Sequence, residues 1–99
     1  MHVITRKRLN EYVQYQDPTA KSGLDRWYRL MKQSNFHSPN EMLQTFSSHK
    51  VDQVNNFTVF DIGGNTAPRI IAVIHYNRKK VYIRHVLTHA EYDKGKWKK

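Results

Sequence analysis

Residues 57–93 constrain the fold most, because they predict three consecutive strands separated by short turns. The segments in chain order are NFTVFDIGGN, PRIIAVIHY, NRKK, VYIRHVL and THAEYD. Alternating side-chain character and frequent β-branched residues predict the strands. The Gly63-Gly64-Asn65 sequence and Asn77 predict the turns. We therefore expect antiparallel hairpins that lead into a short capped segment.

The pairing of the last two strands can be predicted from the turn between them. If residues 77–80 form the connection, Tyr76 lies opposite Val81, and the pairing continues to Arg69 opposite Thr88. Side chains alternate across a strand, which divides the residues between two faces. One face is expected to carry Arg69, Ile71, Val73, His75, Tyr82, Arg84 and Val86. The other is expected to carry Ile70, Ala72, Ile74, Tyr76, Val81, Ile83, His85 and Leu87.

These two predicted faces differ in chemistry. The second face is the more apolar, so we expect the helices to cover it. The first face holds Arg69 and Arg84, and burying unpaired cations in apolar surroundings is costly. We therefore expect the first face to be open and to bind an anion.

The net charge of +9 is unevenly distributed along the chain. From Arg69 onward, nine Lys and Arg residues oppose only two carboxylates, Glu91 and Asp93, which gives +7 in the last third. Such asymmetry indicates a polyanion partner, and nucleic acid is the usual one. A solvated basic surface or an acidic protein partner is compatible with the same charge.

Length and composition exclude several classes of protein. The 99 residues suit one domain, with residues 94–99 as a flexible basic tail. There is no cysteine, and no His/Asp/Glu cluster has metal-ligand spacing, so neither a metal nor a cofactor is expected. No apolar run approaches the roughly 20 residues of a membrane span, and the basic N-terminal cluster is not followed by the apolar segment of a signal peptide. We expect a soluble cytoplasmic protein without a membrane partner.

The first half of the chain predicts a short strand and helices. Residues 2–5 are expected to form a strand, and Thr5 to cap a helix that runs to about Tyr15. The Asp17-Pro18 pair ends this helix, residues 21–23 are expected to be a linker, and residues 22–33 carry apolar residues at helical spacing. These apolar residues, expected in the core, are Leu24, Trp27, Tyr28 and Met31.

Two capping boxes follow later in the chain. Ser38-Pro39-Asn40-Glu41 predicts the start of a short helix, and Thr88-His89-Ala90-Glu91 predicts a second one directly after the last strand. Between them, residues 47–56 are polar and are expected to be a loop with Val51 and Val54 as anchors. Gly95 is expected to stop the last helix.

Four residues form the candidate site: Arg69, Arg84, His89 and Tyr92. RNA cleavage without a metal requires removal of the 2′-hydroxyl proton, protonation of the leaving 5′-oxygen, and stabilisation of charge on the phosphate. Histidine titrates in the right range for proton transfer, arginine grips phosphate through paired hydrogen bonds, and tyrosine transfers a proton or stacks on a base. A basic binding face without catalysis is the alternative that the residues leave open.

The run from Phe57 to Asp93 resembles the HigB-type toxins of bacterial type II toxin–antitoxin modules, within the RelE/ParE superfamily, and the start MHVITRKRL does so too. The residues that carry the resemblance are Gly-Gly-Asn before the strand at Arg69, Tyr82-Ile83-Arg84, and the ending Thr88-His89-x-Glu91-Tyr92-Asp93. It implies an α+β fold, a RelE-like single domain over residues 1–99. In that fold an N-terminal helical hairpin packs on a mostly antiparallel twisted sheet, and a short C-terminal helix follows.

The resemblance also implies an activity and partners. The activity is mRNA cleavage, commonly on translating ribosomes, and the partner is a HigA-type antitoxin with a helix-turn-helix domain. By position, Arg69 and Arg84 would stabilise the phosphate, His89 would be an acid–base group, and Tyr92 would assist or stack. Asp93 matches the motif and is expected to pair with a nearby arginine. The residues expected to bind RNA are Arg78, Lys79, Lys80, Tyr82 and Lys94.

Two other functions remain open at this point. A ParE-like protein would inhibit gyrase and cleave nothing, which would not require the acid–base pair His89 and Tyr92. A non-catalytic nucleic-acid-binding domain would keep the basic face but tolerate the loss of His89.

Overall fold

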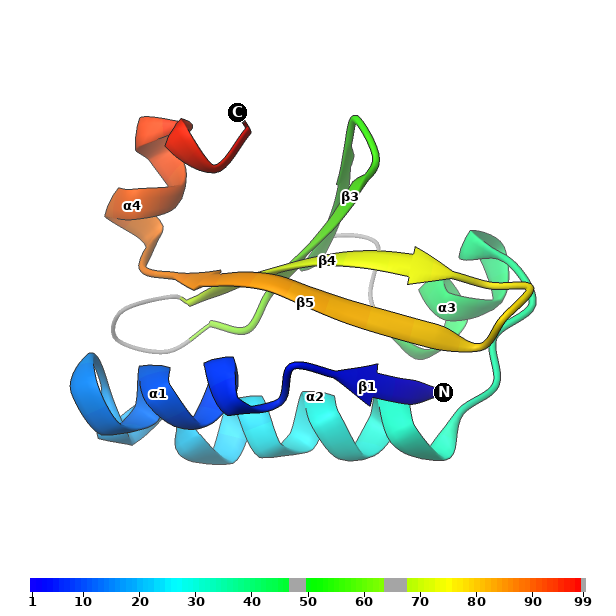
Figure 1. Cartoon of the computed structure of the whole chain (residues 1–99), viewed down its shortest axis with the longest axis horizontal. Coiled ribbons are helices and arrows are strands. Elements are labelled where there is room, and N and C mark those ends of the chain that lie inside the picture. Colours follow the sequence, from blue (N-terminus) through cyan, green and yellow to red (C-terminus); the bar gives the residue numbers. More distant parts are fainter. Residues whose placement is uncertain (47–49, 64–67, 99) are drawn as a thin grey trace.

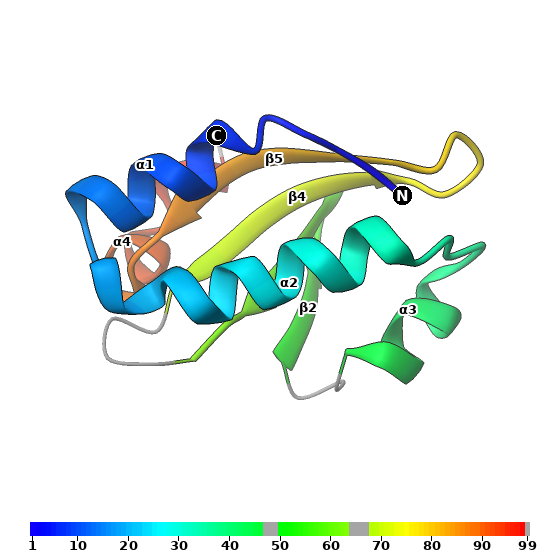
Figure 2. The ribbon, with the colours of Figure 1, turned by 90° about the horizontal axis from the view of Figure 1, so that it is seen from below.

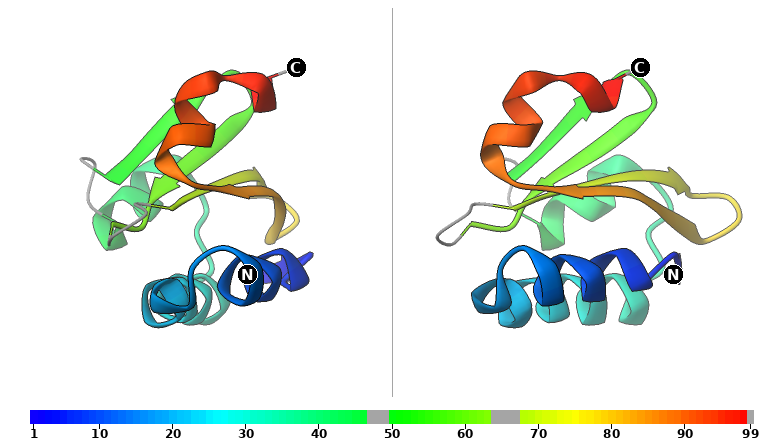
Figure 3. Two further views of the ribbon diagram at one scale, coloured as in Figure 1. Left: turned by 90° about the vertical axis from the view of Figure 1, so that its left-hand side faces the viewer. Right: turned by 60° about the vertical axis from the view of Figure 1, so that its left-hand side comes forward.

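The computed structural model describes residues 1–46, 50–63 and 68–98, which form an α+β arrangement around one mixed sheet. The strand order is β1-β5-β4-β3-β2. Helices α1 and α2 lie on one side of the sheet and α4 lies on the other (Figures 1 and 3). The elements are β1 (His2–Ile4), α1 (Lys7–Tyr15), η1 (Pro18–Ala20), α2 (Lys21–Gln33), α3 (Pro39–Thr45), β2 (Val51–Val54), β3 (Phe57–Asp61), β4 (Arg69–His75), β5 (Lys80–Leu87), α4 (His89–Lys94) and η3 (Lys96–Lys98).

The predicted α+β class is confirmed, although the details of the sheet differ. Strands β2 to β5 pair antiparallel in chain order, as the hairpin pattern predicts for β3, β4 and β5. The strand predicted at residues 2–5 is present as β1, but it runs parallel to β5 along Lys80, Val81 and Tyr82, so the sheet is mixed. The two N-terminal helices follow this strand, so the helical hairpin is not the first element of the fold. None of the helices in the described part is long and apolar enough to span a membrane.

The predicted register of β4 and β5 is wrong in two places. The turn spans residues 76–79, one residue earlier than predicted, because Lys79 adopts a left-handed backbone conformation (φ 55°). His75 consequently lies opposite Lys80, not Tyr82. Each residue of β4 near the turn therefore pairs with a residue of β5 two positions earlier than predicted. Because side chains alternate between the two faces, a shift of two residues leaves each of them on its predicted face.

A β-bulge at Arg84 causes the second error. Ala72 pairs with Ile83, but the next residue, Ile71, pairs with His85, so Arg84 is the extra residue of the bulge. One extra residue reverses the faces beyond it. Val86 therefore packs on the helix side and Leu87 on the opposite side, which is the reverse of the prediction for both.

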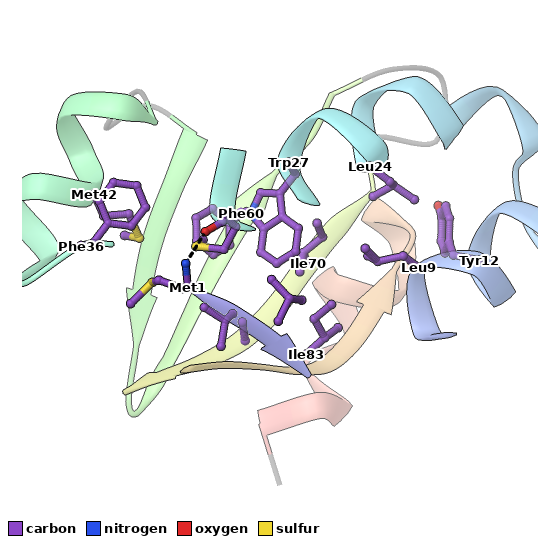
Figure 4. Close-up of a cluster of buried hydrophobic side chains, with 14 of the residues drawn as sticks. Met1, Leu9, Tyr12, Leu24, Trp27, Phe36, Met42, Phe60, Ile70 and Ile83 are labelled. Carbon is purple, nitrogen blue, oxygen red and sulfur yellow. Dashed lines mark hydrogen bonds between the residues drawn. The ribbon is translucent and has the colours of Figure 1, made fainter. Parts of the chain in front are cut away.

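The main core lies between the sheet and helices α1 and α2, as expected from the apolar spacing. Figure 2 shows both helices running across this face of the sheet. Trp27 of α2 is buried and meets the ring of Phe60 edge-on, with centroids 5.3 Å apart. Figure 4 shows the side chains of this core, which include Leu9, Tyr12, Leu24, Trp27, Phe60, Ile70 and Ile83. Burial of this apolar layer is the dominant favourable contribution to folding.

Several predicted helix boundaries need correction. Thr5 does not cap α1; it has a φ of 73°, and the helix begins at Lys7 after Arg6. The predicted linker at residues 21–23 is helical, since Asp17 accepts a hydrogen bond from the Thr19 amide (3.0 Å) and η1 leads directly into α2. In α3, Ser38 caps the helix as predicted. The Glu41 carboxylate, however, accepts from the His37 amide and not from Ser38.

The predicted loop at residues 47–56 contains a strand. Residues 51–54 form β2, because a two-residue turn with Asn55 at a φ of 55° pairs Val54 with Phe57. The sequence VDQV does not alternate, so its pattern gives no strand signal. Residues 47–49, and the Gly64 and Asn65 of the predicted glycine turn, lie outside the described residues. Gly63 does have the predicted positive φ, 79°.

The C-terminal residues, predicted as a mobile basic tail, form defined structure up to Lys98. Lys94 ends α4, and Gly95 terminates the helix with a φ of 71°, as predicted. The chain then makes the turn η3, in which Trp97 is only 5% exposed. Trp97 belongs to a second apolar cluster, with Val59 and Ile71, on the sheet face opposite to α1 and α2.

Gly23 tests the packing of α2 on the sheet. A Cβ at this position would lie 2.7 Å from Cγ2 of Ile62, which is closer than real contacts allow. Gly23→Ala should therefore lower the free energy of unfolding, because overpacking costs about 1–3 kcal/mol and exceeds the gain in helix propensity of about 1 kcal/mol. Urea denaturation measures this, with Ser22→Ala on the exposed face of α2 as the control. A Gly23→Ala variant more stable than the unmodified chain would contradict this packing.

Candidate active site

The site forms where three strand ends meet the start of α4. Arg69 is the first residue of β4, and its partners in the neighbouring strands are Asp61 at the end of β3 and Leu87 at the end of β5. Thr88 and Glu91 form a complete capping box, so α4 begins directly after β5. This box turns the chain sharply and brings His89 and Tyr92, one helical turn apart, to the side chain of Arg69.

Arg69 is the centre of this cluster. Its Nη1 lies 2.6 Å from Oδ1 of Asp61, and its Nη2 lies 3.2 Å from Nδ1 of His89. Its Cζ lies 5.4 Å from the ring centroid of Tyr92, within the range of a cation–π interaction. The Arg69 side chain is 15% exposed. One guanidinium group therefore contacts a carboxylate, an imidazole and a phenol ring at once.

His89 lies between Arg69 and Asp93. A guanidinium only donates, so Nδ1 of His89 is the acceptor in its 3.2 Å contact with Arg69. The other ring nitrogen, Nε2, lies 3.1 Å from Oδ2 of Asp93. The imidazole therefore presents Nδ1 to Arg69 and Nε2 to a carboxylate. Asp93 was expected to pair with an arginine; it orients this histidine instead.

Tyr92 is held by aromatic contacts beside Arg69. Its ring stacks on Trp97, with centroids 5.1 Å apart and planes at 15°, and its backbone carbonyl accepts a hydrogen bond of 3.0 Å from the Trp97 indole. Phe57 of β3 meets the Trp97 ring edge-on, with centroids 5.8 Å apart. Burial raises the pKa of the Tyr92 phenol, and the carboxylates of Asp52 and Asp93 raise it further, against the lowering effect of Arg69. Tyr92 is therefore a proton donor and not a base at neutral pH.

The cluster has the chemical groups that act on a phosphate ester. The guanidinium can donate hydrogen bonds to phosphate oxygens, an imidazole can accept a proton, and the phenol can donate one. The Asp61 carboxylate occupies Nη1 of Arg69, so a phosphate at this position would have to compete with it. Within the described ranges, no three His, Asp or Glu side chains are placed to hold a metal ion.

Arg69 contacts two of the other candidate catalytic residues, His89 and Tyr92. Arg84, the fourth candidate, is the extra residue of the bulge in β5. Arg84 is exposed at the bulge of β5, beside His85, whose pKa it lowers after the larger effects of burial and Arg8.

The candidate RNA-binding residues fall into two groups. Lys94 is exposed on α4, close in sequence to the cluster. Arg78, Lys79 and Lys80 lie at the turn end of the β4–β5 hairpin, about 20 Å from Arg69 along β4. Lys79 donates a hydrogen bond to the carbonyl of Phe36 (3.0 Å), so it has a structural role there.

Tyr82 of β5 lies between the cluster around Arg69 and the turn end of the β4–β5 hairpin. Its ring meets His75 edge-on, with centroids 5.3 Å apart, which confirms that the two residues share a face as predicted.

The sequence did not identify Asp61, Asp52 or Trp97 as parts of this site. Asp61 could have been identified from the β3–β4 register, because it pairs directly with Arg69. Asp52 lies in a strand that the pattern did not predict. The sequence around Trp97 does not indicate that this residue is buried, because it stands between lysines in a segment without apolar periodicity.

Comparison with known proteins identifies the family. The family described as "HigB_toxin, RelE-like toxic component of a toxin-antitoxin system" matches residues 20–95. The chain belongs to the HigB toxin family. Among curated HigB proteins, the mRNA interferase HigB of Escherichia coli O6:H1 is 34% identical over 95 residues, which cover 95% of this chain and 90% of that protein. The mRNA interferase toxin HigB of Escherichia coli K12 is 32% identical over 94 residues, covering 94% and 88% respectively.

The pKa of Tyr92 tests the electrostatics of this HigB site. The tyrosine should titrate above its ordinary range, and Asp52→Asn should lower its pKa, because the substitution removes a carboxylate that disfavours the phenolate. The measurement is the pH dependence of tyrosinate absorbance, with Tyr92→Phe to assign the signal.

Asp25→Asn, which removes a carboxylate paired with Lys21 on α2, serves as the control and should leave the Tyr92 titration unchanged. A Tyr92 that titrates at or below the ordinary range for tyrosine would contradict the arrangement described here.

Proposed function

We propose that this HigB-family chain is the toxin of a type II toxin–antitoxin module and acts as an endoribonuclease that cleaves mRNA. The observation that carries the proposal is the convergence of Arg69, His89 and Tyr92 on one point, in a chain whose relatives are named mRNA interferases. A protein that only binds nucleic acid needs basic residues but no imidazole beside a proton-bearing phenol.

The proposed reaction is attack of a ribose 2′-hydroxyl on the adjacent phosphorus. His89 accepts the 2′-hydroxyl proton at Nδ1 once Arg69 has turned its Nη2 toward the phosphate. The 2′-oxygen then forms a bond to phosphorus while the bond to the 5′-oxygen breaks, which gives a 2′,3′-cyclic phosphate and a free 5′-hydroxyl. Tyr92 supplies the proton for the leaving 5′-oxygen and later regains one from the His89 imidazolium, so protons balance over the cycle.

The remaining side chains of the cluster position these groups. Arg69 stabilises the added negative charge on the nonbridging oxygens. Asp93 stabilises the imidazolium through its contact with Nε2 of His89, and Asp61 holds the guanidinium in place until the phosphate arrives. Each of the three chemical tasks is therefore assigned to one side chain of the cluster.

We further propose where the RNA and the partners contact the protein. Arg84 and Lys94, both exposed, contact the phosphates next to the cleaved bond, and Tyr82 lies along the same path. Arg78 and Lys80 are too far from Arg69 to touch the same phosphate and contact the RNA, or the ribosome on which it is translated, further along. Cleavage takes place in the cytoplasm on translating ribosomes, and a HigA-type antitoxin with a helix-turn-helix domain neutralises the toxin.

Induced expression tests the proposed function directly. Mapping of transcript 5′ ends after induction should reveal new ends within coding regions, together with growth arrest. A supercoiling assay with purified gyrase distinguishes the ParE-like alternative, because a gyrase inhibitor would block supercoiling and create no new transcript ends. Growth arrest without new 5′ ends would contradict the endoribonuclease assignment.

His89→Ala separates catalysis from binding. It should slow RNA cleavage about 10²–10⁴-fold, the usual contribution of general acid–base catalysis, while RNA affinity changes only a few-fold. His75→Ala, which removes an exposed histidine that contacts Tyr82 and not Arg69, is the matched control and should cleave at nearly the unmodified rate. Equal losses of cleavage and binding in His89→Ala would support a protein that only binds RNA.

A further inference from the structure

The outer edge of β5 is only partly covered by β1. The parallel pairing of β1 ends at Ile4 opposite Tyr82, so residues 83–87 have no strand beside them on this side within the described chain. Figure 1 shows this half of β5 between α1 below and α4 above, while β1 lies along the other half. An open edge presents a row of backbone N–H and C=O groups to a further strand. Residues 83–87 offer about 16 Å of such edge.

Two grooves flank this open edge and share His85 and Leu87. The groove toward α4 has a volume of about 340 Å³ and is lined by Trp97, Lys94 and Lys96 in addition to the shared residues and Glu91. The groove toward α1 has a volume of about 270 Å³ and includes Arg8, Tyr12 and Tyr15. Tyr15 is 73% exposed and is the one large hydrophobic side chain of the described residues with such exposure. Side chains of an added strand would alternate between these two grooves.

The charges around the edge favour an acidic occupant. Arg8, Lys94 and Lys96 line the grooves, and Arg84 projects at the bulge next to His85. Arg8 and Arg84 both lower the pKa of His85, after the larger effect of burial, which reflects the positive potential along this edge. A second copy of this chain would bring the same cations together and is therefore disfavoured.

The grooves also distinguish a peptide from RNA. Glu11 and Glu91 each line one groove and would repel a continuous phosphate backbone. A peptide strand can place acidic residues opposite the cations, apolar residues on Leu87 and Trp97, and its backbone against the edge of β5. Addition of a strand to an exposed sheet edge is a common mode of peptide recognition.

We propose that residues 83–87 of β5 are the docking site of an acidic, extended segment of the antitoxin, which adds a strand to the sheet beside β1. The proposal rests on the proposed function, since that function supplies the antitoxin. The docked segment pairs with Arg84 and Lys94 and so removes two RNA contacts without entering the cluster of Arg69, His89 and Tyr92. The docked segment thereby inhibits the toxin in two ways. It compensates the positive charge of Arg84 and Lys94, and it covers the approach of RNA to the cluster along α4.

Amide hydrogen exchange tests the docking site. The probe is the antitoxin encoded in the reading frame beside this chain, co-expressed and purified as the complex, with the toxin alone as the reference. The amides of residues 84–87 should exchange at least 10-fold more slowly in the complex. Protection confined to other elements would overturn the inference and leave the toxin–antitoxin function intact, whereas an antitoxin that does not bind at all would overturn both.

Charge reversal provides the matched variants. Arg8→Glu combined with Tyr15→Ser should weaken antitoxin binding at least 10-fold, whereas Arg29→Glu, an equal charge change on the outer face of α2, should weaken it less than 2-fold. Circular dichroism confirms that each variant is folded. Equal weakening by both reversals would overturn the inference, because it would indicate attraction to overall charge. Protection of residues 84–87 by a short single-stranded RNA, but not by the antitoxin, would overturn it in favour of nucleic acid.

Discussion

The contact between Arg69 and Asp61 determines how the rest of the site is arranged. Arg69 stands at the first position of β4, where the antiparallel register places it directly opposite Asp61 at the end of β3. Because the carboxylate holds one end of the guanidinium, the other end is available to donate to Nδ1 of His89. A mostly buried arginine without such a partner would be strongly destabilising. The same contact means that a phosphate bound by Arg69 would have to compete with the Asp61 carboxylate.

Helix α4 has the second essential role, although it is short and has no buried residue of its own. A helix of this length is not stable in isolation, so its position depends on three local contacts: the capping box at its start, the left-handed Gly95 at its end, and the stack of Tyr92 on Trp97. Trp97 in turn rests against Val59 and Ile71 on the sheet. The residues that follow the helix therefore support the side chains that it presents.

Local sequence signals predicted most elements of the fold, and the failures have identifiable physical causes. The apolar spacing of Leu24, Trp27 and Met31 and the capping box at Thr88 are local, and both predictions were confirmed. The β-bulge at Arg84 leaves no mark in an alternating pattern, so the faces of Val86 and Leu87 were reversed. The burial of Trp97 depends on a long-range contact with Phe57, which a lysine-rich segment does not reveal. The contacts of Arg69 with His89 and Tyr92 were predictable because they depend on strand ends and one capping box.

We propose that Arg69, His89 and Tyr92 act together on one phosphodiester. A crystal structure of the protein bound to an RNA with a 2′-deoxy nucleotide at the cleavage position is the sharpest test, because this RNA lacks the nucleophile and stays intact. The scissile phosphate should lie within hydrogen-bond distance of the Arg69 guanidinium, having displaced Asp61, with the site of the missing 2′-hydroxyl facing Nδ1 of His89. A scissile phosphate bound at the Arg78–Lys80 end of the hairpin, with the Arg69–Asp61 contact unchanged, would exclude this mechanism.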